Sequence, residues 1–167
     1  YLRILMREGE FAPLSRVDIL GRYLEESLRR PSDSYNTTFN AKNKLEVLSA
    51  FVYDLYTTER DTFDDRDWLN FCERYQQETL TEFSASDLLS ELVETRVMVK
   101  WGQRTFLRYR FYFNYFLGKF ISSKQGELTK FLENEDYLRV SGVVDIITGL
   151  SSDNTSIVQA LAGKLEI

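Results

Sequence analysis

The fold of this 167-residue chain is decided by residues 96–120, which read RVMVKWGQRTFLRYRFYFNYFLGKF. Apolar side chains alternate with Lys and Arg on both sides of Gly102, and this pattern predicts a short two-stranded hairpin. From Phe111 to Ser122 the spacing becomes helical and strongly aromatic, which predicts a helix buried on almost all sides. One face of the hairpin is expected to hold the apolar residues Val97, Val99, Leu107, Tyr109 and Phe111. Positive charge is expected from Lys100, Arg104, Arg108 and Arg110.

Three amphipathic helices are predicted before this hairpin, over residues 41–57, 65–80 and 84–94. The last has the clearest start, because Ser84 and Asp87 have the spacing of a capping box and Phe83 can pack on Leu88. Three helices followed by a hairpin is the order of a winged-helix domain. The sequence therefore predicts a mainly α fold, a winged helix with additional flanking helices.

The flanking segments also show helical patterns. Residues 14–28 begin with Ser15 and Asp18 at capping-box spacing, and the stretch 29–40 lacks periodicity and is expected to be a linker. Short apolar patches at 128–132, 140–150 and 157–165 suggest the start of a helical repeat. We expect a helical segment with a linker at 1–40, the winged helix at 41–124, and the start of a C-terminal helical region at 125–167.

Composition narrows the possible functions. The net charge of −5 argues against a general nucleic-acid binder. The chain has no histidine and one cysteine, Cys72, which excludes Cys/His zinc sites, triads that need imidazole and an internal disulfide. No apolar run approaches the roughly 20 residues that cross a bilayer. We expect a cytoplasmic protein without a membrane partner, and the start at Tyr1 suggests a piece of a longer chain.

The stretch YRFYFNYFLGKF at 109–120 resembles the end of the winged-helix domain in STAND NTPases of the NACHT type, where an arginine-rich strand runs into an aromatic helix. With decreasing specificity the resemblance extends over nearly the whole chain, from a lid-like helical segment to trailing helices. It implies a regulatory module of a signalling switch that controls nucleotide-dependent oligomerisation, for example in antiphage defence. The implied partners are an upstream NTPase core and further copies of the parent protein.

The resemblance also implies a nucleotide-binding position. Relatives often place a histidine at the strand-to-helix junction, where it contacts the phosphates of ADP. In this chain Tyr109 stands near that place, between Arg108 and Arg110, and a phenol and two guanidinium groups can donate hydrogen bonds to phosphate. The alternative interpretation is that Tyr109 only fills the core beside the hairpin.

No phosphate loop occurs in the sequence, so no catalytic residue and no cofactor is expected here. By the resemblance, ATP or ADP and Mg²⁺ would bind to the parent protein, while the chain by itself is not expected to be an enzyme.

The residues allow two other interpretations. A stand-alone winged-helix regulator could bind DNA or protein, although Asp87, Glu91 and Glu94 on the expected recognition helix disfavour DNA. Three acidic residues, Asp64, Asp65 and Asp67, could bind a metal, but their place before Trp68 favours helix capping. Cys72 is expected to be a buried structural thiol.

Overall fold

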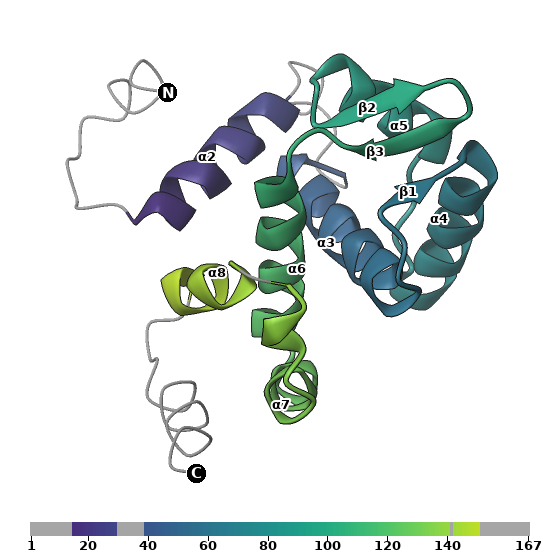
Figure 1. The fold of residues 1–167 in the computed structure, drawn as a ribbon. Helices are drawn as coiled ribbons and strands as arrows, with labels where there is room; N and C mark the ends of the chain where they lie inside the picture. Colours follow the sequence, from purple (N-terminus) through teal and green to yellow (C-terminus); the bar gives the residue numbers. More distant parts are fainter. Residues whose placement is uncertain (1–14, 30–38, 141, 151–167) are drawn as a thin grey trace, which may run out of the picture.

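The computed structural model describes residues 15–29, 39–140 and 142–150 (Figure 1). The predicted segments at 1–14, most of the linker, and the patch at 157–165 lie outside the described residues. The described helices and strands follow one another as α2 (Arg16–Leu28), α3 (Ala41–Thr57), β1 (Thr62–Phe63), α4 (Asp65–Thr79), α5 (Ala85–Glu94), β2 (Met98–Trp101), β3 (Arg104–Leu107), α6 (Arg110–Ser123), α7 (Gln125–Glu133), the short 3₁₀ helix η2 (Asp136–Leu138) and α8 (Val143–Leu150).

The elements from α3 to β3 have the order helix, strand, helix, helix, strand, strand, which is that of a winged helix. The predicted fold class is thus confirmed, but the sheet has three antiparallel strands in the order β1-β3-β2, not two. β1 was missed because its two residues form a strand only by pairing with β3, with Thr62 opposite Phe106 and Phe63 opposite Thr105. So short a strand leaves no periodic pattern in the sequence.

The register of β2 and β3 assigns the two faces of the hairpin. Met98 pairs with Leu107 and Lys100 with Thr105, while Val99 pairs with Phe106 and Trp101 with Arg104. Since successive residues of a strand point to opposite faces, the first two pairs share the inner face with buried Phe63, and the other two share the outer face. The predicted apolar face was therefore wrong in part, because Leu107 lies on the face opposite to Val99.

Each of the four helices from α2 to α5 begins at a side-chain cap. Ser15, Asn40 and Asp64 each accept a hydrogen bond from a backbone N–H one turn later, and the third residue of each helix returns the bond, which completes a capping box. Ser84 accepts from the Asp87 N–H at 3.3 Å. These bonds satisfy N–H groups that have no partner inside the helix, so they fix the helix starts from local sequence alone.

The aromatic helix α6 lies in the middle of the fold, between α3 on one side and α8 on the other (Figure 1). Its buried residues occupy most of its circumference, as predicted: Tyr112, Phe113, Tyr115, Phe116, Leu117, Gly118 and Ile121. Among its aromatic residues Phe111 is 43% exposed and Phe120 is half-buried. Tyr109 and Phe111 do not belong to the hairpin face, because the chain turns into the helix at Arg110.

One continuous hydrophobic core runs from α2 through the winged helix to α8. Close approach of α8 to its neighbours depends on two glycines: a Cβ on Gly118 of α6 would lie 2.7 Å from Ile146 Cγ2, and one on Gly149 of α8 would lie 2.6 Å from Val17 Cγ2 of α2. Of the two flanking helices, α8 packs directly on α6 and α2 packs directly on α3. Among the described residues, no helix is long and apolar enough to cross a membrane.

Candidate functional site

The junction between β3 and α6 brings together the three residues that the resemblance selects. Tyr109 is the N-cap residue of α6, in extended conformation, and its side chain makes no capping hydrogen bond. Its ring is 44% exposed and stacks on Phe111, with centroids 5.3 Å apart and planes within 15°. The alternative interpretation, in which Tyr109 fills the core, is therefore wrong.

Both arginines of the junction lie against aromatic rings. The Arg108 guanidinium is 5.2 Å from the centre of the Tyr109 ring, and the Arg110 guanidinium is 4.6 Å from that of Phe113. Stacking on a ring holds a guanidinium in place while leaving its N–H groups able to donate. The Arg108 backbone N–H donates to Val97 O at 3.0 Å, which extends the hairpin up to the helix.

This arrangement suits an anion. The first turn of α6 directs backbone N–H groups and the positive end of the helix dipole toward the junction. The three consecutive residues of the junction add two guanidinium groups and a phenol that can donate hydrogen bonds. Phosphate is the anion for which such a combination of backbone and guanidinium donors is best known.

A buried ion pair, which the sequence patterns did not reveal, ties three helices together. Lys44 Nζ on α3 donates to Glu91 Oε1 on α5 at 2.9 Å and to the Leu28 carbonyl at the end of α2 at 3.0 Å. The two charged side chains are 4% and 7% exposed. A Lys or a Glu in an amphipathic helix is usually expected on the solvent-exposed face. Only the spacing of Lys44 and Glu91 from the apolar residues of their helices could have indicated that their side chains are buried.

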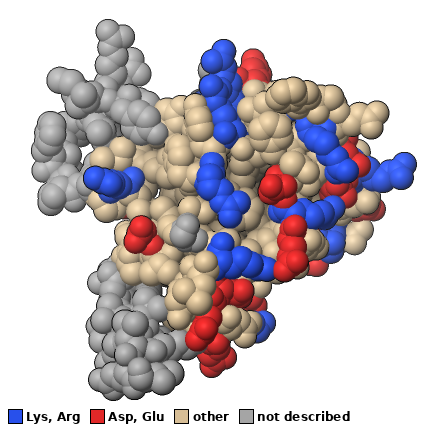
Figure 2. Space-filling view, viewed as in Figure 1, with Lys and Arg blue, Asp and Glu red and all other residues tan. Residues whose placement is uncertain are grey.

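The burial of Glu91 changes the view of α5 as a recognition helix. Glu91 faces the core, whereas Asp87 and Glu94 are exposed, so two of the three acidic residues remain on the surface of α5. On the side of the molecule shown in Figure 2, basic and acidic side chains are interspersed. A surface that binds duplex DNA usually carries a block of basic residues, whereas the surface of α5 carries the acidic residues Asp87 and Glu94.

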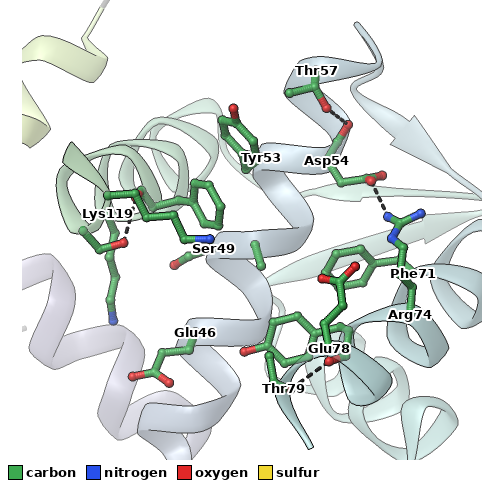
Figure 3. Close-up of a pocket in the computed structure, with 15 residues that line it drawn as sticks. Glu46, Ser49, Tyr53, Asp54, Thr57, Phe71, Arg74, Glu78, Thr79 and Lys119 are labelled. Carbon is green, nitrogen blue, oxygen red and sulfur yellow. Dashed lines mark hydrogen bonds and ion pairs between the residues drawn. The ribbon is translucent and has the colours of Figure 1, made fainter. Parts of the chain in front are cut away.

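A groove of about 520 Å³ lies between α3, α4 and α6 (Figure 3). Its floor on α3 is low because Ser49 and Ala50 are small, and aromatic rings line both sides: Tyr53 and Phe120, which stack with centroids 4.2 Å apart, and Phe71 and Tyr75. Burial lowers the pKa of Lys119 at the α6 side, although Glu46 and Glu25 partly oppose this shift. Charges of both signs line the groove, so it has no evident preference for one ionic ligand.

Two smaller pockets also lie on the described part of the chain. An apolar groove of about 490 Å³ lies between α4 and α5, over Trp68, Leu69 and Leu89. A pocket of about 220 Å³ beside α7 contains Tyr53, whose hydroxyl hydrogen-bonds Glu127, and Tyr56, whose ring lies 4.7 Å from the Arg139 guanidinium. Burial is the main cause that raises the pKa values of both phenols.

The acidic residues before Trp68 act as a cap and as ion-pair partners. Asp64 accepts from the Asp67 N–H at 2.9 Å, Asp65 pairs with Lys100 at 2.6 Å, and Asp67 pairs with Arg60 at 3.0 Å. The capping interpretation is confirmed.

Cys72 is fully buried on α4, and desolvation raises the pKa of its thiol to about 12. The predicted burial is confirmed, and the thiol is too weakly acidic to act as a nucleophile near neutral pH.

Comparison of the chain with protein-family models, curated proteins and solved structures gives no match.

Proposed function

We propose that the chain is the regulatory winged-helix module of a STAND NTPase of the NACHT type, a signalling switch whose oligomerisation depends on the bound nucleotide. The observation that carries the proposal is the β3–α6 junction, where Arg108, Tyr109 and Arg110 lie together at the start of a 14-residue aromatic helix. The strand β3 is followed directly by this helix, and this is the order of elements that the resemblance implies.

In this proposal the winged helix is the element with two positions. It packs on the nucleotide-binding core of the parent protein when ADP is bound, and it rotates away after exchange for ATP. A ligand shifts such an equilibrium only by its difference in affinity for the two states. Arg108, Tyr109 and Arg110 would supply this difference by donating to the phosphates of ADP in the closed state.

The same proposal assigns ATP, ADP and Mg²⁺ to an upstream NTPase core, so this chain alone is not an enzyme. It places the parent protein in the cytoplasm, as an oligomer in its active form, and is compatible with a role in antiphage defence. The two-state element would transmit nucleotide exchange to the flanking helices, because α2 and α8 pack directly on the winged helix.

The proposal is tested first on the coding region upstream of Tyr1. We expect a strand followed by Gly-x-x-x-x-Gly-Lys-Ser or Gly-Lys-Thr in the same reading frame. A start codon close to Tyr1 would instead favour a stand-alone winged-helix regulator.

A second test uses the full-length protein and its retention of ADP. Tyr109→Ala is expected to release ADP faster, and Tyr109→Phe should do the same if the hydroxyl donates to phosphate. Arg108→Ala is expected to release ADP faster as well. Its control is Lys130→Ala, which also removes one positive charge, but from an exposed position on α7. Unchanged ADP retention in both Tyr109→Ala and Arg108→Ala would contradict the assigned contact.

A further inference from the structure

The basic residues of the chain are concentrated in one stretch. Between Thr95 and Gly126 there are seven Lys or Arg residues and no Asp or Glu. The rest of the chain therefore holds 14 of the 21 basic residues and all 26 acidic residues. The chain has a net charge of −5, but this segment, which forms the hairpin, the junction and α6, has only positively charged side chains.

Within this segment the outer face of the sheet carries exposed aromatic and basic side chains. Trp101 precedes the turn at Gly102 and is 80% exposed, and Arg104, also exposed, is its cross-strand partner. Phe106, in the central strand β3, is half-buried on the same face and pairs with Val99. Tryptophan and arginine are among the residue types most enriched where proteins bind their partners tightly.

We infer that the outer face of this sheet binds single-stranded nucleic acid, with bases stacked on Trp101 and Phe106 and a phosphate held by Arg104. The inference is independent of the proposed function, which uses the junction and not the hairpin tip.

Geometry favours a strand of nucleotides as the occupant. Alternate residues of β3 lie about 7 Å apart on one face, since a strand rises about 3.4 Å per residue. Arg104 and Phe106 are therefore neighbours on this face, a cation beside a ring, and Trp101 lies across from Arg104 on β2. Aromatic platforms flanked by arginine are the usual means by which proteins bind single strands without sequence preference.

The residues of the outer face do not line any of the three cavities described above. A protein anchor residue usually fills a pocket, whereas a base can stack on an exposed ring. The expectation drawn from the net charge disfavours nucleic acid, but it averages over the chain, and the acidic residues of α5 lie on a different element.

One carboxylate stands near the basic face. Arg104 is close enough to Asp67 to contribute to the lowered pKa of that carboxyl group, whose largest cause is the hydrogen bond from the Asp64 backbone. Asp67 already pairs with Arg60 at 3.0 Å, so Arg104 is not its main partner.

The test measures binding of the whole chain to a fluorescein-labelled oligothymidylate of about 15 nucleotides by anisotropy. We expect binding that weakens as salt rises from about 50 to 200 mM. Trp101→Ala should weaken it about tenfold or more, because stacking of one base contributes about 1–3 kcal/mol. Arg104→Ala should lower the slope of log affinity against log salt by about 0.7, and Lys130→Ala should leave the slope unchanged.

Tryptophan fluorescence gives a readout that a loss of folding would not mimic. The second tryptophan, Trp68, is fully buried, so quenching by the oligonucleotide should come from Trp101 and should vanish in Trp101→Phe. The inference is overturned if the oligonucleotide fails to bind, if Trp101→Ala and Lys130→Ala bind equally well, or if duplex DNA binds more tightly. Equal binding of a polyglutamate peptide would also overturn it, and would point to an acidic protein partner.

Discussion

Replacement of Glu91 by leucine tests the buried ion pair that joins α2, α3 and α5. In the wild type Lys44 Nζ lies 2.9 Å from Glu91 Oε1, and both side chains are almost fully buried. Glu91→Leu removes the carboxylate that lies 2.9 Å from this buried ammonium group. Breaking a buried pair in this way costs about 3–5 kcal/mol, a large part of the roughly 5–15 kcal/mol that stabilises a typical domain.

The double variant Lys44→Met/Glu91→Leu removes both charges and should recover most of the loss. Apolar replacement of a whole buried pair is often neutral, or stabilising by about 1–4 kcal/mol. Urea unfolding followed by circular dichroism gives the four free energies, those of the wild type, Glu91→Leu, Lys44→Met and the double variant, and the m-value shows whether the transition stays two-state. The coupling energy of the double-mutant cycle then isolates the pair from the other contacts of each residue.

A surface pair provides the control for this experiment. Arg29 and Glu26 lie 2.7 Å apart, but their side chains are 56% and 35% exposed. Glu26→Leu should cost less than about 1 kcal/mol, because water already screens the pair. If Glu91→Leu cost no more than Glu26→Leu, the argument from burial would be refuted.

Three further predictions concern packing, reactivity and capping. Gly118→Ala should cost about 1–3 kcal/mol in urea unfolding because its Cβ would meet Ile146, whereas Gly126→Ala, at a site with no close neighbour among the described residues, should be neutral or slightly stabilising; equal effects would contradict the close contact. The buried thiol of Cys72 should react with a disulfide reagent only after urea is added, and rapid reaction in the native protein would show that α4 opens readily. Asp64→Ala should destabilise the chain by about 0.5–2 kcal/mol, since it removes the N-cap of α4, and an unchanged urea midpoint would argue against the capping bond.

The local sequence determined where three of the described helices begin, α2, α4 and α5. Ser15 and Ser84 are predicted as caps, and so is the acidic group at 64–67, because a cap and its partner lie within one turn of each other and the interaction involves only residues close together in the sequence. The change of period after Gly102 likewise predicted a hairpin followed by an aromatic helix. Both signals are short-range, which is why they could be interpreted without knowing the fold.

The tertiary structure decided the features that depend on distant residues. Thr62 and Phe63 become a strand only through β3, more than 40 positions later, and the alternation could not show that the strand ends before Tyr109. Burial of Lys44 was also hidden, because a charged side chain can enter the core only where a partner such as Glu91 meets it from another helix. The sequence by itself determined the helices and the hairpin, whereas the third strand, the exposed junction and the buried charge pair arose from contacts between segments far apart in the chain.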